Sequence, residues 1–265
     1  MEIDGKSKLY AIVADPIAQV KTPQTLNALM REKNFNGVLV PMQVAPEQLA
    51  TWFEGLRGIK NFGGLIVTVP HKQAIAKLCD EVSDAARLIG AVNVVRRQPD
   101  GRMVGEILDG KGFVAGLRGN DIEPNGKRVF LAGAGGAANA IAFALAEAGV
   151  AELGIHNRTV EKVDDLISRL HEVYPGFNAT AVGASPMDYD IVVNATSLGM
   201  KESDPLSLNA DELSPEQVVA EIIMTPETTP LLAAAQNRGC KIHYGLPMLR
   251  SQANLMAAFV GIGDS

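Results

Sequence analysis

The stretch Arg128-Val-Phe-Leu-Ala-Gly-Ala-Gly-Gly-Ala-Ala-Asn139 decides the fold class of this chain. A short run of β-branched and aromatic residues leads into Gly133, Gly135 and Gly136, and an alanine-rich segment follows. This order predicts the strand, tight turn and helix of a dinucleotide-binding βαβ unit. A pyrophosphate can approach where no Cβ blocks it, and the free N–H groups of the following helix would face the anion. The three glycines and Ala137 are therefore the expected phosphate-binding residues. Turns with two glycines also occur without a ligand, so this stretch alone leaves both interpretations open.

The composition describes a folded protein of one or two domains, and two domains fit the length better. The chain has 265 residues, 47% of them hydrophobic, and a net charge of −6. The negative charge argues against a nucleic-acid or anionic membrane partner, because both require a basic face. No apolar run approaches the roughly 20 residues that span a bilayer, and the first residues lack the apolar segment of a secretory leader. We therefore expect a cytoplasmic protein, either a monomer or a homodimer.

The cysteines and histidines show none of the spacings that are typical of metal sites. Cys79 and Cys240 are far apart, and neither belongs to a CxxC pattern. The four histidines form no HExxH or other paired motif. We expect two reduced thiols, no disulfide and no metal.

The N-terminal part of the chain alternates buried strands with short helices. The strand expected at 63–69 is stopped by Pro70, so His71 and Lys72 fall at its carboxyl end, where open α/β sheets bind ligands. A lysine at such a position is also often simply solvated. Thr22 stands before a proline, which predicts a helix N-cap. The expected strands are 9–14, 37–44, 63–69, 90–95 and 101–107, and the expected helices are 24–33, 46–56, 73–79 and 83–88.

The C-terminal part continues the alternation, which predicts a parallel, doubly wound sheet. The segment 119–126 is rich in turn-forming residues and is the best linker, so a domain boundary fits near it. Asp109 stands before a glycine, where an aspartate is most often a turn or cap residue. Besides the glycine-rich stretch, the expected strands are 152–156, 190–194, 218–223 and 241–244, and the expected helices are 160–174, 230–237 and 246–260.

Basic residues stand where a unit that prefers NAD carries an acidic residue. The strand 152–156 ends about 20 residues past the glycines, and Asn157, Arg158, Thr159 and Lys162 follow it. Two cations and a hydroxyl suit a ribose 2′-phosphate, and a guanidinium can bind its oxygens in a bidentate pair. The sequence therefore predicts NADP rather than NAD. Asn157 and Thr159 can also cap the next helix, and both roles can coexist.

Spaced motifs along nearly the whole chain share one family pattern. They are Asp15-Pro16 with Thr22-Pro23 and Asn27, Val67-Thr-Val-Pro-His-Lys72, Gly90-Ala-Val-Asn93, Asp109-Gly110 with Gly112, Gly133-Ala-Gly-Gly136, Asn157-Arg-Thr159, Asn194-Ala-Thr-Ser-Leu-Gly-Met200, and Gly245 with Met248-Leu-Arg-Ser-Gln252. Read together, they resemble the shikimate dehydrogenase family, whose members interconvert 3-dehydroshikimate and shikimate with NADP(H). Relatives in this family act on quinate and aminoshikimate.

The resemblance implies roles for individual residues. Lys72 and Asp109 match the catalytic pair, with Lys72 exchanging the proton of the reacting oxygen and Asp109 acting as its partner and as a substrate ligand. The substrate-binding positions are Thr22, Thr68, Asn93 and Gln252. The positions that line the nicotinamide half of the cofactor are Thr196, Ser197, Gly199, Met200, Gly245, Met248 and Leu249.

Several polar positions of the family are apolar here. Of the two serines that hold the substrate carboxylate, Val20 replaces the first and Thr22 the second. Ile66 replaces an asparagine, Leu108 a threonine, and Met224 a tyrosine. A threonine at the second serine position occurs in relatives that accept quinate, but this does not explain the valine. Each lost donor to a buried charged group is worth about 1.5 to 3 kcal/mol, which predicts weaker shikimate binding or a different ring acid.

The resemblance implies an α/β protein of two domains. An NADP-binding Rossmann domain with a doubly wound parallel sheet, residues 112–244, would be inserted into an α/β substrate-binding domain made of residues 1–111 and 245–265. We expect a divergent family member, an NADP-dependent oxidoreductase of shikimate or a closely related cyclic hydroxy acid. The alternatives are a quinate or aminoshikimate dehydrogenase, and an NADP-binding relative without catalysis.

Overall fold

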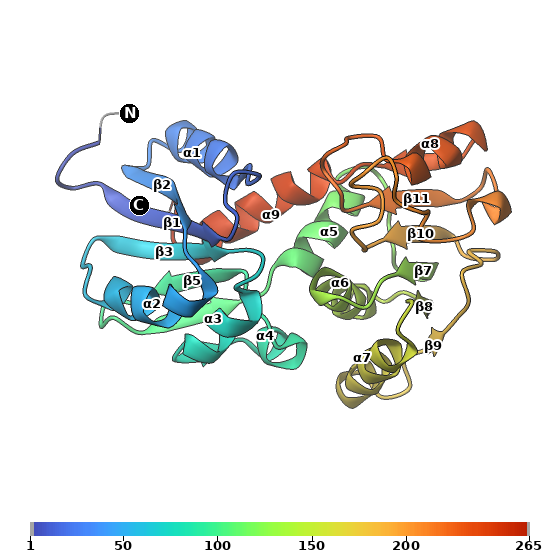
Figure 1. The fold of residues 1–265 in the computed structure, drawn as a ribbon, viewed down its shortest axis with the longest axis horizontal. Helices are drawn as coiled ribbons and strands as arrows, with labels where there is room; N and C mark the ends of the chain where they lie inside the picture. The colour runs from blue at the N-terminus through green and yellow to red at the C-terminus, as the bar shows by residue number, and fades with distance from the viewer. Residues whose placement is uncertain (1–2, 264–265) are drawn as a thin grey trace. The chain divides into compact units, whose positions relative to one another are not determined.

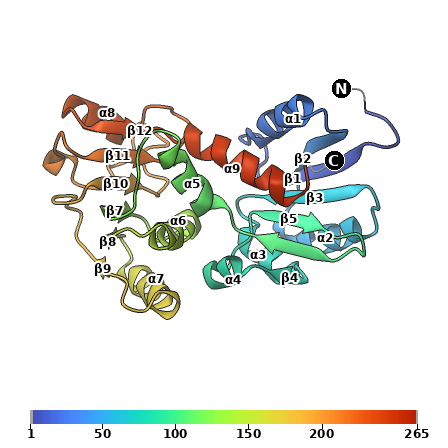
Figure 2. The ribbon, with the colours of Figure 1, turned by 180° about the vertical axis from the view of Figure 1, so that it is seen from behind.

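The structure is a computed structural model that describes residues 3–263, and it divides into two compact units. Unit 1 contains the chain up to Leu108 together with the segment from Gln252 onward, and unit 2 is Asp109–Ser251. Each unit contains one six-stranded sheet with helices packed against it (Figures 1 and 2).

The sheet of unit 1 is mixed, in the order β2-β1-β3-β5-β6-β4. Its strands are β1 (Lys8–Ala14), β2 (Gly37–Gln43), β3 (Phe62–Val67), β4 (Glu81–Val82), β5 (Val94–Arg97) and β6 (Met103–Glu106). The strands β2, β1 and β3 are parallel, whereas β5 is antiparallel to both β3 and β6. As a result, β1 and β3 end at the same edge at which β5 begins. We call this edge of the unit 1 sheet the carboxyl edge, and the opposite one the amino edge.

Helices cover both faces of this sheet, which explains why its central strands are continuously apolar. On one face, α1 (Thr22–Glu32) and the last part of α9 (Leu246–Phe259) pack on β1. Tyr10 and Ile12 of β1 join Leu26 of α1 in this core cluster. Figures 1 and 2 show α2 (Leu49–Arg57) and α3 (Lys72–Leu78) on the other face. The unit also contains the 3₁₀ helix η1 (Pro46–Gln48) and α4 (Asp84–Ile89).

The sheet of unit 2 is entirely parallel, in the order β12-β11-β10-β7-β8-β9. Its strands are β7 (Arg128–Ala132), β8 (Glu152–His156), β9 (Ala179–Ala181), β10 (Ile191–Asn194), β11 (Val218–Glu221) and β12 (Lys241–His243). The chain runs outward from β7 to β9 and then returns to β10 on the other side of β7. This reversal between β7 and β10 is the topological switch point at which doubly wound sheets bind ligands.

The helices of unit 2 also lie on both faces of their sheet. In Figure 1, α6 (Gly136–Glu147) and α7 (Val160–Val173) lie on one side and α8 (Pro230–Asn237) on the other. The α8 side is closed by Phe130 of β7 and Leu232 of α8, together with the 3₁₀ helix η2 (Ala210–Glu212). The helix α5 (Asp109–Arg118) precedes the sheet in the chain.

Some expected elements differ from the observed ones in detail. Lys21, not Thr22, occupies the N-cap of α1, and no side chain caps that helix. The expected helix at 46–56 is a 3₁₀ turn followed by α2. The strands β4 and β9 were not expected, because two and three residues are too few to show a period.

The units divide at other residues than those expected from the sequence. The first division falls after Leu108, not at the 119–126 linker or at 111/112, because α5 packs on α6. A Cβ on Gly110 would collide with the backbone oxygen of Ala140. The second division falls inside α9, not at 244/245. The start of α9 lies against α5, where a Cβ on Gly116 would be 3.0 Å from the nitrogen of Met248.

Candidate functional site

The turn after β7 requires a glycine at its first position. Gly133 has a φ of +117°, and its N–H donates to the backbone oxygen of His156 at 2.7 Å. A Cβ there would lie 2.9 Å from the backbone oxygen of Ala195, which follows β10. The loops after β7, β8 and β10 therefore meet at Gly133, at the switch point of the sheet.

The next residues leave the N-terminus of α6 open. Gly135 is the N-cap and offers no side chain, and a Cβ on Gly135 or Gly136 would have no heavy atom within 4 Å. The first turn of this 12-residue helix contains no acidic residue. Its first N–H groups, including that of Ala137, and the positive end of its dipole suit an anion such as a pyrophosphate.

The basic residues expected to read the 2′-phosphate follow β8. Arg158 is exposed and forms no ion pair with any other residue of 3–263, and Lys162 is exposed one turn into α7. The expected side-chain cap of α7 is not formed. Thr159 occupies the N-cap, but its side chain accepts no capping bond, and Asn157 donates instead to the backbone oxygen of Thr159 at 2.9 Å. The Thr159 hydroxyl is thus not used to cap the helix.

A buried polar network, which the sequence did not single out, holds the loop after β10. Asn194 is fully buried, and its Nδ2 donates to Glu221 Oε1 at 2.8 Å and to the backbone oxygen of Leu198 at 3.0 Å. Its Oδ1 accepts from the backbone N–H and the hydroxyl of Thr196, at 3.1 and 2.7 Å. These bonds fix the course of the chain through Thr196 and Ser197, both of which were predicted to line the nicotinamide.

The same network continues to the loops after β11 and β12. Glu221 is fully buried and accepts from the Thr229 hydroxyl at 2.9 Å, and Thr229 in turn caps α8. Burial raises the pKa of the Glu221 carboxyl, although its hydrogen bonds oppose the shift. A Cβ on Gly245 would collide with the backbone oxygen of Ile223, so the loop after β12 passes close to the one after β11. Polar residues at the ends of two buried strands, Asn194 and Glu221, are the sequence signal that could have revealed this network.

In unit 1, the carboxyl edge of the sheet gathers three predicted site residues. Thr68 follows β3, and its N–H donates to the backbone oxygen of Val13 in β1 at 3.1 Å. Lys72 begins α3, and its backbone oxygen accepts from Val92 at 3.0 Å. Asn93 precedes β5, and its backbone oxygen accepts from Val67 at the end of β3 at 2.8 Å. Thr68 and Lys72 therefore lie at one edge with Asn93, which comes 21 residues after Lys72 in the sequence.

Two buried side chains hold this edge in place. The His71 ring is 1% exposed, and its Nε2–H donates to the backbone oxygen of Val44 at 2.8 Å, which anchors the start of α3. Asn93 is also 1% exposed, and its Oδ1 accepts from the N–H of Leu108 at 2.8 Å. Asp109, the first residue of α5, follows Leu108 directly and is itself buried.

Three of the four apolar replacements noted in the sequence belong to a single cluster. Ile66 and Leu108 are 4% and 6% exposed and belong to the core beneath α1 and α9, and Val20 packs against that core. In unit 2, by contrast, Met224 is 39% exposed. Three positions that are polar in the family thus contribute side chains to one apolar core cluster.

The structure places the remaining predicted residues as follows. Thr22 is half-buried at the start of α1, and Gln252 is buried in the unit 1 part of α9. Met200 is 58% exposed. Met248 and Leu249 are buried in the first turns of α9. All the predicted cofactor residues thus belong to unit 2, and Thr22, Thr68, Asn93 and Gln252 belong to unit 1. Asp109, the predicted partner of Lys72 and substrate ligand, is the first residue of unit 2.

Within residues 3–263, no group of three or more histidine, cysteine or acidic side chains is arranged to hold a metal ion. In the same range, no helix has the length and apolar character needed to cross a membrane. Cys79 and Cys240 are free thiols, and burial raises the pKa of Cys79 to about 12.

Comparison with known proteins matches both units to one family. The family model described as "Shikimate dehydrogenase substrate binding domain" matches residues 12–95, and "Shikimate / quinate 5-dehydrogenase" matches residues 119–201. The chain is 40% identical to a shikimate dehydrogenase (NADP(+)) of Rubrobacter xylanophilus, over 94% of this chain and 89% of the relative.

Solved structures give the same result. A shikimate dehydrogenase in complex with NADP+ has a TM-score of 0.91 and 32% identity, over 98% of this chain and 91% of the other. A 5-ketofructose reductase of Gluconobacter sp. strain CHM43 has a TM-score of 0.86 and 32% identity, over 97% and 93% of the two chains. The predicted α/β fold class and the predicted family are both confirmed: this chain belongs to the shikimate dehydrogenase family.

Proposed function

We propose that this chain is an NADP-dependent oxidoreductase that interconverts 3-dehydroshikimate and shikimate or a closely related cyclic hydroxy acid. The observation that carries the proposal is the carboxyl edge of unit 1, where Thr68, Lys72 and Asn93 are held together by the ends of three strands. A secondary alcohol held at this edge would be surrounded by the hydroxyl of Thr68, the amide of Asn93 and the amine of Lys72. This is the set of groups that an alcohol dehydrogenase without a metal needs.

In the oxidation, Lys72 acts as the general base. Its neutral amine takes the proton of the reacting hydroxyl while the hydride leaves the same carbon, so that a ketone forms. In the reduction, the ammonium of Lys72 returns the proton to the carbonyl oxygen. We assign Asp109 as the partner of Lys72 and as a substrate ligand, and Thr22, Thr68, Asn93 and Gln252 as the groups that orient the ring.

The cofactor proposal rests on unit 2. NADP, when bound, supplies the nicotinamide that accepts or donates the hydride. The open α6 N-terminus at Gly135 and Gly136 suits the pyrophosphate, and Arg158, Thr159 and Lys162 suit the 2′-phosphate. The loops carrying Thr196, Ser197, Met200, Gly245, Met248 and Leu249 are assigned to the nicotinamide half.

A second substrate class is favoured by one observation, the apolar cluster of Val20, Ile66 and Leu108. Val20 offers no hydrogen bond to a carboxylate, and a related structure at 32% identity is named a 5-ketofructose reductase, which acts on an uncharged sugar. A polyhydroxy ketone without a carboxylate is therefore the second candidate. Quinate and aminoshikimate remain alternatives within the first class.

The test is a steady-state panel with purified protein. Shikimate, quinate and aminoshikimate are oxidised with NADP+ and with NAD+, and 3-dehydroshikimate and 5-ketofructose are reduced with NADPH, between pH 6 and pH 10. We expect kcat/KM to be highest for a ring acid with the NADP couple. Turnover of 5-ketofructose alone would move the assignment to the second class. Absence of turnover with every compound, in protein that binds NADP, would support the non-catalytic alternative.

We place this reaction in the cytoplasm. The free thiols Cys79 and Cys240 support this location, because solitary reduced cysteines are usual in a reducing compartment.

A further inference from the structure

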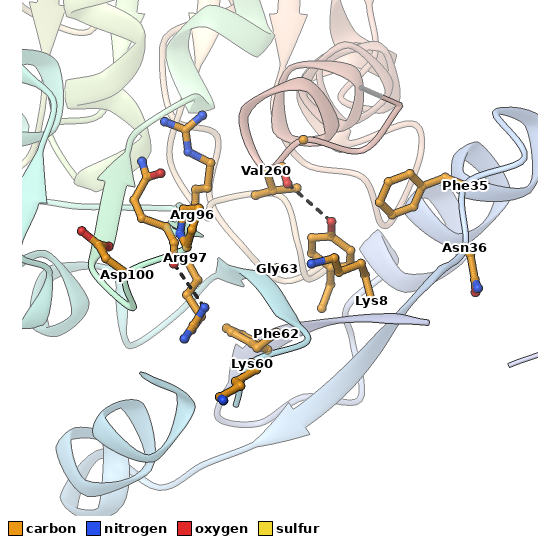
Figure 3. A pocket seen from close by; sticks show the side chains of 14 residues that line it. Lys8, Phe35, Asn36, Lys60, Phe62, Gly63, Arg96, Arg97, Asp100 and Val260 are labelled. Atoms are coloured by element: carbon orange, nitrogen blue, oxygen red, sulfur yellow. Dashed lines mark hydrogen bonds between the residues drawn. The ribbon is translucent and has the colours of Figure 1, made fainter. Parts of the chain in front are cut away.

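A recess in unit 1 lies at the amino edge of the sheet, away from the residues assigned to catalysis. It has a volume of about 970 Å³ and is open to solvent on one side. Figure 3 shows its lining, which includes Lys8 at the start of β1, Phe62 at the start of β3 and Arg96 near the end of the antiparallel β5. Because β1 runs seven residues from Lys8 to Ala14, about 20 Å separates this recess from the carboxyl edge.

The charge of the lining is opposite to that of the whole chain. Lys8, Lys60, Arg96 and Arg97 line the recess, whereas Asp100 is its only carboxylate and is bound to Arg102 outside the lining. None of the four cations forms an ion pair with a carboxylate in the described range 3–263. In Figure 3 the carboxylate of Asp100 points away from the lysines. A chain of net charge −6 thus concentrates unpaired positive charge around one hollow, which attracts anions.

The two arginines are fixed in place by groups that leave their charge uncompensated. Arg97 donates through Nε and Nη2 to the backbone oxygen of Arg57, at 3.1 and 2.9 Å, and through Nη1 to that of Gln98 at 3.1 Å. Arg96 lies over the ring of Phe259, 5.3 Å from its centroid, and its buried Nε has no hydrogen-bond partner in the described range. A buried donor without a partner is costly, and the positive charge of the same guanidinium is balanced by no carboxylate in the described range.

The remaining walls are apolar and aromatic. Phe35 and Phe62 contribute rings, and the Tyr10 hydroxyl donates to the backbone oxygen of Val260 at 3.4 Å. Burial raises the pKa of Tyr10 to about 12, so this hydroxyl stays uncharged and does not oppose an anion. A recess of this volume with several polar groups in its lining and apolar walls is typical of a small-molecule site.

We propose that this recess binds a small polyanion, a molecule with two or more phosphate or carboxylate groups, at a site distinct from the nucleotide turn and the carboxyl edge of unit 1. The guanidinium groups of Arg96 and Arg97 and the ammonium groups of Lys8 and Lys60 are its ligands. Phosphate and carboxylate oxygens share the geometry that guanidinium groups bind. The proposal does not depend on the substrate of the enzyme.

Isothermal titration calorimetry with inorganic pyrophosphate and with citrate tests this site, in a low-salt buffer of uncharged or cationic components. The protein is the full chain carrying Gly135→Ala, which places a methyl group in the open space of the nucleotide turn and weakens competing phosphate binding there. We expect one site per chain, with an affinity that falls as sodium chloride rises. The tighter of the two probes identifies the oxyanion as phosphate or carboxylate.

Two variants locate the binding, and a third controls for charge. Arg96→Gln should weaken the tighter probe at least about tenfold, and Lys60→Gln should weaken it several-fold. Arg87→Gln removes an exposed arginine of α4 outside the recess and should change the affinity less than about twofold. Lys60 is exposed, so its substitution leaves the core intact even where Arg96→Gln lowers the melting temperature.

Two results would overturn the proposal. One is the absence of heat of binding with both probes in the Gly135→Ala protein at low salt. The other is equal affinity in Lys60→Gln, Arg96→Gln and Arg87→Gln, because the cations of the recess would then contribute no more than a distant arginine.

Discussion

The turn after β7 and the carboxyl edge of unit 1 are built from opposite kinds of residue. At the turn, Gly133, Gly135 and Gly136 keep side chains out of the space at a helix N-terminus. At the edge, Val20 and Leu108 contribute apolar side chains to one packed cluster. The turn depends on backbone groups that no side chain may cover. The edge depends on the packing of side chains, which other side chains can replace. The turn expected to hold the pyrophosphate of the cofactor keeps the family pattern, whereas the edge expected to select the substrate departs from it.

The largest expected effect concerns the carboxyl edge. Lys72→Met should lower kcat by a factor of about 10² to 10⁴, the range of general acid–base catalysis, and leave the dissociation constant of NADP unchanged. Stopped-flow or steady-state kinetics and a fluorescence titration of NADPH measure the two quantities. Lys77→Met, which changes an exposed lysine in the last turn of the same helix, is the matched control. A normal kcat in Lys72→Met would show that Lys72 is not the general base, and the carboxyl edge would then no longer be assigned to the chemistry.

The next effect concerns the region after β8. Arg158→Ala should raise KM for NADP by an order of magnitude or more while KM for NAD stays nearly constant, because only NADP presents a 2′-phosphate to the guanidinium. The measurement is KM for NADP and for NAD in the Arg158→Ala enzyme and in the unmodified enzyme. Arg238→Ala, on the surface of unit 2, controls for the change in net charge. Equal losses with NADP and NAD would show that Arg158 supports the fold of the loop instead.

A pair of glycine variants separates the two demands of the turn. Gly135→Ala should weaken NADP about tenfold with a small change in melting temperature, because its Cβ enters space that is empty in the protein itself. Gly133→Ala should destabilise the fold by about 1 to 3 kcal/mol, because φ is +117° and the Cβ meets the Ala195 oxygen. Gly126→Ala, also at positive φ but with open space around it, measures the backbone strain alone. Unchanged NADP affinity in Gly135→Ala would place the pyrophosphate elsewhere.

The smallest effect tests the apolar cluster. Val20→Ser restores a hydroxyl at a half-buried position and should strengthen binding of a carboxylate substrate by up to about tenfold. Ile66→Asn should instead destabilise the protein by about 1 to 3 kcal/mol, because an amide at a position that is 4% exposed would stand among apolar side chains. Inhibition or Michaelis constants for shikimate and urea unfolding measure the two outcomes. If Val20→Ser changed no constant for any ring acid, the valine would not face a substrate carboxylate.

The sequence was informative where one local rule decides the structure. Gly133 needs its position for backbone reasons alone, and β7 before it is continuously apolar after its first residue. The parallel alternation of strands and helices was therefore predictable, and so was the position of Lys72 at a strand end. The functional roles of Lys72, Asp109 and the substrate-binding residues stay predictions that the experiments above address.

Local sequence patterns could not predict the packing between residues that are distant in the chain. Val20, Ile66 and Leu108 each look like isolated substitutions along the chain, and only the folded unit shows that they share one core. The network that joins Asn194 to Thr229 likewise bridges residues whose partners lie on different strands and loops. The four cations of the recess come from three separate places in the sequence, so no motif could have marked them.

The arrangement of α9 has a consequence for how the chain acquires its structure during synthesis. Tyr10 donates to the backbone oxygen of Val260, and the core beneath β1 is completed by Ala253, Met256 and Ile262. Those partners leave the ribosome about 250 residues after β1, whereas every residue of Asp109–Ser251 has been made before them. The unit that begins the chain is therefore the last to be able to close. Until residues 253–262 have been made, the apolar strands of unit 1 stay exposed and can pair with other chains. These residues therefore protect the nascent protein from aggregation.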